Sequence, residues 1–340
     1  MSRFIREANK GYNDWYLYLI TIVAVLVAVF LGQLPTLFVV NNRINSGIVD
    51  PARIEQFWNS PDFSLLGIPT FIGLALIMLG HVVAAVALYM CVRGFHKRKF
   101  ISVVTARRPF DLRRFGVGFS LWFGLTVLLE VVMYVVDPAN YTLQLDMGKW
   151  LPLIAICLLI VPIQTSIEEI FIRGYLFQGI GKATGSALTA VMLTSVIFIS
   201  MHLANPEVQN FGIGVMMVYY GTVAVFLAIL TYLDDGLELA LGVHAATNIY
   251  GASFVTFEGS VMQTDAIYRL HDVNAWWMTA GFLMMIVIFT LIVKRIYPIR
   301  PFSFLFEPID QNDNSEIQII YDEGSFTGGA SDTTDDMGAG

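Results

Sequence analysis

Long apolar runs separated by short polar segments are the dominant pattern along the chain. Eight runs have about the length of a membrane span, and none alternates with the two-residue period of a barrel strand. Because a bilayer admits only helices or closed barrels, the pattern predicts an all-α polytopic membrane protein with about eight transmembrane helices. The predicted spans are 16–40, 65–92, 115–136, 150–165, 186–203, 213–233, 237–255 and 276–293.

Lysine and arginine gather in three regions between and beside these runs. Short loops rich in these residues stay on the cytoplasmic side of a membrane, and an even number of spans separates the three regions, as this requires. The pattern therefore predicts that both termini and the loop 93–114 are cytoplasmic. The basic residues are Arg3, Arg6, Lys10, Arg93, Lys97, Arg98, Lys99, Arg107, Arg108, Arg113, Arg114, Lys294, Arg295 and Arg300.

The composition changes after the last run. Residues 301–340 hold nine acids and no lysine or arginine, so the net charge of −7 becomes about +2 for the remainder (−7 + 9). Such a polar segment cannot bury enough apolar surface to order itself, so residues 299–340 are predicted to be an acidic, disordered cytoplasmic tail. Nothing in the charge pattern indicates nucleic-acid binding. Cys91 and Cys157 lie in apolar runs, as small buried side chains do.

Two adjacent acids, Glu168 and Glu169, follow the fourth apolar run, and Arg173 lies four residues after the second. Charged side chains are costly in a membrane, so they indicate a functional site. On a helix, residues four apart face each other, whereas adjacent residues diverge by about 100°. The spacing therefore predicts an ion pair between Glu169 and Arg173 and leaves Glu168 free to act as a general base. The alternative is a non-catalytic ion-pair cluster at the cytoplasmic interface.

Polar side chains recur in two later apolar runs, as His202 and then as His244 with Asn248. His244 and Asn248 are four residues apart, so one helix face carries an imidazole and an amide suited to donate to a developing oxyanion. The alternative for each residue is packing, because polar side chains also bond neighbouring membrane helices together. All three groups together, in apolar surroundings, are harder to attribute to packing.

These residues resemble a known family. The patterns Glu-Glu-x-x-x-Arg at 168–173, Phe-x-x-x-His at 198–202 and His-x-x-x-Asn at 244–248 are similar to the three motifs of the type II CAAX prenyl endopeptidases. These enzymes belong to the wider family of CAAX proteases and bacteriocin-processing enzymes. The resemblance covers about residues 145–255, with no departure inside the motifs, and residues 1–140 match only as membrane helices.

The resemblance implies an intramembrane endopeptidase whose helices enclose a catalytic chamber open to the cytosol. Glu168 together with His202 would activate the hydrolytic water. His244 and Asn248 would stabilise the tetrahedral oxyanion. In this scheme the peptide bond is hydrolysed near the membrane surface.

Glu169 and Arg173 would support the geometry of the same site. Glu168, His202 and His244 are also residue types that bind Zn²⁺, and together they would leave an open position for water. A metal-free glutamate mechanism needs the same residues, so the sequence leaves metallo- and glutamate-type hydrolysis equally open, and Zn²⁺ is the one cofactor to consider.

The predicted helix ends place these groups at conflicting depths. His202 lies about 24 Å along the fifth span from its cytoplasmic end, whereas Glu168 lies near the cytoplasmic end of the fourth. The groups converge only if the fourth helix carries Glu168 deeper, or if residues 171–183 re-enter the membrane.

Four other ionisable residues stand outside the motifs. His81 and Glu130 lie within the second and third apolar runs, where either would suit the wall of a chamber or a substrate path. His96 and His271 fall in polar loops and are predicted to be surface residues.

The sequence thus predicts N-terminal membrane helices over 1–140, a catalytic membrane core over 141–298 and the tail over 299–340. Expected partners are membrane lipids and a peptide or protein substrate, lipidated or not, at a bacterial plasma membrane. Two other classes remain: a non-catalytic membrane immunity or interaction protein, and a proton-coupled transporter. The missing internal repeat counts against the transporter.

Overall fold

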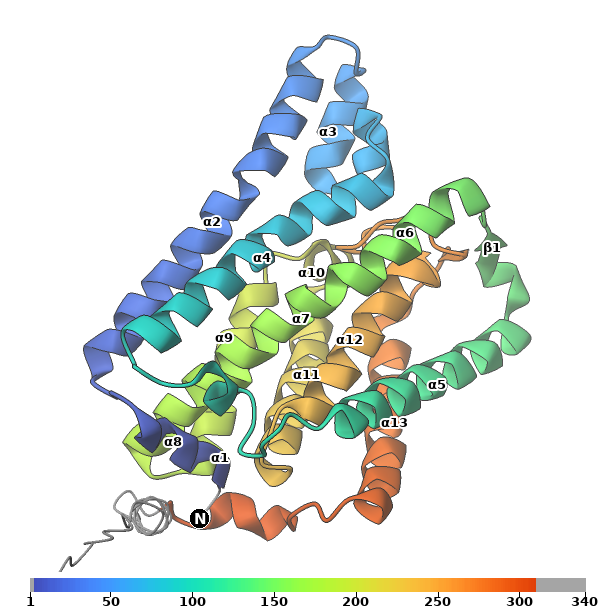
Figure 1. The fold of residues 1–340 in the computed structure, drawn as a ribbon. Helices are drawn as coiled ribbons and strands as arrows, with labels where there is room; N and C mark the ends of the chain where they lie inside the picture. Colours follow the sequence, from blue (N-terminus) through green and yellow to red (C-terminus); the bar gives the residue numbers. More distant parts are fainter. Residues whose placement is uncertain (1–2, 310–340) are drawn as a thin grey trace, which may run out of the picture.

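A computed structural model describes residues 3–309, and helices account for most of its regular structure (Figure 1). The α-helices are α1 Arg3–Arg6, α2 Trp15–Asn45, α3 Pro51–Asn59, α4 Thr70–Gly94, α5 Leu112–Val136, α6 Met147–Leu159, α7 Val161–Glu169, α8 Phe177–Thr184, α9 Ala187–His202, α10 Pro206–Phe211, α11 Ile213–Leu233, α12 Glu238–Ser253 and α13 Ala275–Ile296. The π-helical segment η5 Ile170–Leu176 joins α7 to α8. Short 3₁₀ turns are η1 Glu7–Lys10, η2 Phe63–Leu66, η3 Phe100–Val103, η4 Pro138–Asn140 and η6 Phe302–Phe306.

One small sheet lies among the loops at the end of the molecule away from the N-terminus (Figure 1). Its strands are β1 Tyr141–Leu143, β2 Val255–Phe257 and β3 Tyr268–Leu270. Their order is β1-β3-β2, with β1 antiparallel and β2 parallel to β3. The sheet ties the connection before α6 to the connection between α12 and α13.

The chain is a multi-pass integral membrane protein. Six helical segments of the described chain are long and apolar enough to cross a membrane: 15–45, 70–94, 112–136, 147–184, 213–233 and 275–296. Their outer faces expose large apolar side chains, such as Phe30 and Phe38 on α2. In water such faces would aggregate, whereas in lipid they need no cover.

The all-α membrane fold is confirmed, but eight full-length spans are not. The runs at 186–203 and 237–255 fold as α9 and α12, each of 16 residues and below the length of the other six. The run at 150–165 proved much longer than predicted, because α6, α7, η5 and α8 follow one another in a single 38-residue stretch.

Local hydrogen bonds fix where several helices begin. The side chains of Asp111, Ser186 and Asn274 accept hydrogen bonds from backbone N–H groups in the first turns of α5, α9 and α13. A capping side chain satisfies donors that the helix itself leaves unpaired, and each is worth about 1 kcal/mol.

Ion pairs and hydrogen bonds bring four segments together at one end of the molecule, which we call the basic end: α1, the loop 95–111, the acidic turn 234–237 and residues 297–309. Arg107 binds Asp234 and Glu238, each at 2.9 Å, and Arg114 also pairs with Asp234. Arg300 binds Asp235 at 2.5 Å. These ion pairs join segments that are far apart in the sequence.

His96 is not the surface residue that its loop position predicted. The side chain is fully buried at the basic end, where Nδ1 lies 2.7 Å from the Tyr12 carbonyl and Nε2 lies 2.7 Å from the Tyr175 hydroxyl. Burial, the largest effect, lowers the pKa of His96, because the charged ring would lose its hydration. His271 is exposed, as predicted, and both cysteines are buried and free.

The first residues of the predicted tail, up to Ile309, pack on the helices. Residues 302–306 form η6, Leu305 is buried, and the Ile309 N–H donates to the Gly185 carbonyl at 2.9 Å. The run of aromatic and apolar side chains in this segment gives it a surface to bury, so it docks on the helices. The remaining tail, residues 310–340, lies outside the described residues.

Candidate active site

Glu168 and Glu169 occupy the last two positions of α7, where α-helical bonding gives way to the π-helical segment η5. π-Helical turns are rare and often lie at functional sites. Because the helix continues to Thr184, Glu168 lies 21 residues after its start at Met147 and 16 before its end. The fourth helix thus carries Glu168 deep, which removes the conflict of depth without a re-entrant segment.

The predicted pairing of Glu169 with Arg173 is confirmed. Arg173 Nη1 lies 3.0 Å from Glu169 Oε1, and both side chains are fully buried. The guanidinium also stacks on the Phe198 ring, with its carbon 4.0 Å from the ring centroid. A buried ion pair of this kind costs much to break, because the surviving charge has no water around it.

His244 is held against the same glutamate. Its Nδ1 lies 2.7 Å from Glu169 Oε1, so Nδ1–H donates to the carboxylate, and its Nε2 lies 3.7 Å from Glu168 Oε2. Glu169 therefore orients both Arg173 and His244. The hydrogen bond at Nδ1 fixes the orientation of the His244 ring, so Nε2 points toward Glu168.

Glu168 has two partners that the sequence motifs do not contain. Its Oε1 accepts a hydrogen bond from Gln164 Nε2 at 2.6 Å and lies 3.3 Å from His81 Nε2 on α4. Its Oε2 is buried without a hydrogen-bond partner among the described residues. One oxygen is thus fixed in place, and the other is left for a ligand.

Gln164 links Glu168 to Asn248. Asn248 Nδ2 donates to Gln164 Oε1 at 3.0 Å, which directs the Gln164 amide hydrogens toward Glu168. The motif analysis missed Gln164, although it lies one helical turn before Glu168 and is polar in an apolar run. The same i, i+4 rule that paired Glu169 with Arg173 would have found it.

His202 is the last residue of α9. Its Nδ1 lies 2.7 Å from the Phe198 carbonyl, and because a carbonyl only accepts, Nδ1 carries the proton and the neutral ring has Nε2 as its basic atom. The ring also lies against Phe198 and Tyr220, with centroids 4.1 and 4.8 Å away. These contacts fix the ring plane.

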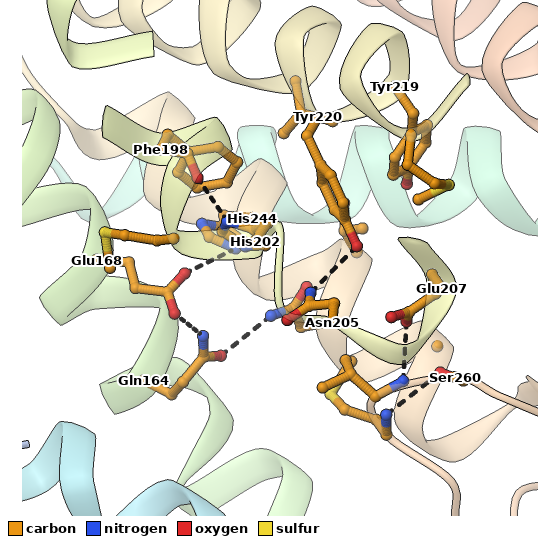
Figure 2. A pocket seen from close by; sticks show the side chains of 18 of the residues that line it. Gln164, Glu168, Phe198, His202, Asn205, Glu207, Tyr219, Tyr220, His244 and Ser260 are labelled. Atoms are coloured by element: carbon orange, nitrogen blue, oxygen red, sulfur yellow. Dashed lines mark hydrogen bonds and ion pairs between the residues drawn. The ribbon is translucent and has the colours of Figure 1, made fainter. Parts of the chain in front are cut away.

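One cavity of about 370 Å³ brings the four predicted catalytic residues together. Glu168, His202, His244 and Asn248 all line it, from three different helices (Figure 2). Figure 2 shows the Glu168 carboxylate facing the histidines and Gln164. Of the two residues predicted to suit the wall of a chamber, His81 lines the cavity, whereas Glu130 does not and instead accepts a hydrogen bond from Tyr141.

Glu168, His202 and His244, the residues considered as zinc ligands, all line this cavity. In the described part of the chain, no three histidine, cysteine or acidic side chains are grouped so that they could hold a metal ion. Glu168 is held by Gln164, and His244 turns one nitrogen toward Glu169.

Membrane helices thus bring a glutamate, two histidines and an asparagine together around one cavity. The family model described as type II CAAX prenyl endopeptidase, Rce1-like, matches residues 148–250, which span all three motifs. The chain belongs to this family of CAAX-type intramembrane proteases.

The match extends well beyond the motifs. The uncharacterized protein YyaK of Bacillus subtilis (strain 168) is 30% identical over 267 residues, which cover 77% of this chain and 84% of YyaK. No solved structure matches the chain. The similarity to YyaK therefore includes much of the N-terminal half, where His81 lies.

Proposed function

We propose that the protein is an intramembrane endopeptidase of the glutamate type, with Glu168 and His202 activating water. The observation that carries this proposal is the single cavity that holds Glu168, His202, His244 and Asn248, with one Glu168 oxygen lacking a partner among the described residues. A buried carboxylate with a free oxygen beside imidazole nitrogens is suited to general-base catalysis.

The proposed reaction begins when a water oxygen attacks the carbon of the peptide carbonyl. Glu168 takes one water proton, and His202 Nε2 accepts a hydrogen bond from the other. The carbonyl electron pair moves onto its oxygen, which becomes the oxyanion. The carbon–nitrogen bond then breaks, the nitrogen takes the proton from Glu168, and an amine and a carboxylic acid leave.

His244 and Asn248 would stabilise the oxyanion. Asn248 Nδ2 uses one hydrogen for Gln164 and retains a second. His244 gives its Nδ1–H to Glu169, so its Nε2 can donate only when the ring is an imidazolium. Glu169 and Arg173 would support this arrangement from beneath the cavity. Each oxyanion donor, His244 or Asn248, would contribute about 10²–10³ to the rate.

We also propose that both termini face the cytoplasm of a bacterium, with the protein in its plasma membrane. In support, α1, the loop 95–111, the turn 234–237 and residues 297–309 come together at the basic end, so the positive-inside rule applies to them as a unit. The substrate would be a peptide or protein segment, lipidated or not, that enters from the membrane.

Purified protein in lipid nanodiscs, incubated with a mass-spectrometric panel of lipidated and unlipidated peptides, tests the proposal. Glu168→Gln and His202→Gln should each lower cleavage about 10²–10⁴-fold while the unfolding temperature stays unchanged. Glu130→Gln, a membrane glutamate outside the cavity, is the matched control and should cleave normally. Full activity in Glu168→Gln, or no cleavage by folded wild-type protein, would contradict the proposal.

A further inference from the structure

The cavity lies toward the end of the molecule away from the basic end. Leu74 and Met278 line it close to the starts of α4 and α13, and Gly251 lines it close to the end of α12. These helix ends adjoin the sheet and α10 (Figure 1). The wall is completed by residues of α10 and of the loop 257–262, so the cavity reaches the surface loops there.

The opposite side of the cavity is closed by packing. Beneath Glu168 lies the fully buried pair of Glu169 and Arg173. Ile172, Tyr175 and Leu237 continue this layer within the largest apolar cluster and are also inaccessible. A peptide that reached Glu168 from the basic end would have to displace this core.

Glu207 is a second buried carboxylate in the cavity wall. It lies on α10 and is 7% exposed, and its Oε1 accepts a hydrogen bond from the Val261 N–H at 2.8 Å. Its Oε2 is buried with no hydrogen-bond partner in the described chain. Figure 2 shows Glu207 on the far side of Asn205 from Glu168. Burial raises the pKa of Glu207, because the carboxylate has lost water without gaining a cation.

Glu207 has no permanently charged basic side chain near it in the described wall of the cavity. Among the described residues that line the cavity there is no lysine or arginine. Aromatic rings are abundant instead, including Tyr219, Tyr220, Phe257 and Phe282. An unpaired carboxylate among aromatic faces and apolar surface is the environment that a cationic side chain with an apolar stem fits best.

We infer that Glu207 is a specificity subsite for a lysine or arginine of an apolar peptide segment that occupies the cavity. The cation pairs with Glu207 Oε2, and the peptide bond a few residues away lies at Glu168. The cleavage of that bond rests on the proposed function, whereas the binding of the cation does not.

Peptide binding to the Glu168→Gln protein tests the subsite without any need for turnover. Fluorescent apolar peptides that carry one lysine, one norleucine or one glutamate at the same position are titrated into nanodiscs. The lysine peptide should bind about tenfold or more tightly than the norleucine peptide, the effect expected for one hydrogen bond to a charged group. The glutamate peptide should bind most weakly.

Adding Glu207→Gln should remove the preference, because glutamine keeps the acceptor for the Val261 N–H but not the charge. Glu258→Gln, an exposed acid in the neighbouring loop, is the control and should retain it. Equal weakening of all three peptides in Glu207→Gln would show a structural role and overturn the subsite, as would an undiminished preference for lysine. If the lysine preference holds but the wild type cleaves nothing, the subsite stands and the proposed hydrolysis fails.

Discussion

Glu169 holds the site together through a single oxygen. Its Oε1 accepts from both Arg173 and His244, while its Oε2 is buried with no hydrogen-bond partner among the described residues. The charge on Glu169 therefore depends on Arg173 for compensation, and the direction of the His244 ring depends on Glu169. Glu169 therefore contributes both to the stability of the fold and to the geometry of the candidate site.

Replacing Arg173 with methionine should cost about 3–5 kcal/mol in the free energy of unfolding, because it leaves the Glu169 charge buried and unpaired. The double variant Glu169→Gln/Arg173→Met should recover most of that loss, since the glutamine oxygen still accepts from His244. Unfolding in mixed micelles measures both. A double variant as unstable as the single one would show that packing on Phe198, rather than charge, accounts for the effect.

His81 should act as a positioning residue for Glu168, because its Nε2 lies 3.3 Å from the oxygen that Gln164 also holds. We expect His81→Leu to lower kcat about tenfold with little change in KM, and His81→Gln, which keeps a donor, to restore part of the loss. Steady-state cleavage kinetics separate the two constants. A change confined to KM, or a loss that His81→Gln does not relieve, would assign His81 to packing.

Residue spacing predicted the local contacts of the site but not the distant ones. The i, i+4 rule paired Glu169 with Arg173 because both lie on one helix. His81 and Glu168 are 87 positions apart and lie on different helices. No periodicity within either helix specifies such a pair. His96 was mispredicted for a related reason: loop composition does not show that α1 and η1 pack over the loop.

At the scale of elements, η5 is held by close packing against the loop 95–111. Gly174 lies so near that loop that an added Cβ would be 2.1 Å from the Val103 carbonyl oxygen and 3.3 Å from Leu237 Cδ1. The backbone of the loop cannot turn away as a flexible side chain could. The position directly after the first motif therefore requires glycine, because two backbones approach closely there.

Gly174→Ala should destabilise the protein by about 1–3 kcal/mol or more, as overpacking of a core does, and should lower cleavage by displacing Glu168. The matched control is Gly124→Ala on α5, where an added Cβ meets nothing within 4 Å. That variant should be as stable as the wild type or slightly more so. Thermal unfolding of the two proteins side by side measures the difference, and equal midpoints would contradict the packing argument.

Hydropathy located the helices well and their ends poorly. The apolar runs gave every long span, since burial in lipid requires apolar side chains whatever the helices pack against. The run at 150–165 was ended too early because Glu168, Glu169 and Arg173 look like an interface, whereas their mutual pairing lets the helix continue to Thr184. Charge that is neutralised within a fold does not mark a membrane boundary.

At the scale of the whole molecule, the cavity is open toward one end and sealed toward the other. The pair of Glu169 and Arg173, the apolar cluster around Tyr175 and the ion pairs of Arg107 lie between Glu168 and the basic end. A transporter needs a path that can reach both sides of the membrane. The proposed hydrolysis needs no such path, so we expect no proton transport that depends on Glu168.

Liposomes that contain the protein and an internal pH dye should show no proton flux dependent on Glu168, with or without an imposed gradient. The Glu168→Gln protein is the control and should give the same trace as the wild type. A flux that disappears in Glu168→Gln would contradict both the seal and the enzyme proposal.

The unequal lengths of α2 and α9 have a consequence for the lipid around the protein. With about 1.5 Å per residue, the 31 residues of α2 extend about 46 Å and the 16 residues of α9 about 24 Å, against a hydrocarbon layer of about 30 Å. Met192 and Val196 expose the outer face of α9 directly to acyl chains. The bilayer should therefore be thinner beside α9 than beside α2. Short apolar segments of other proteins, mismatched elsewhere in the membrane, would collect on that flank, next to the helix that carries His202.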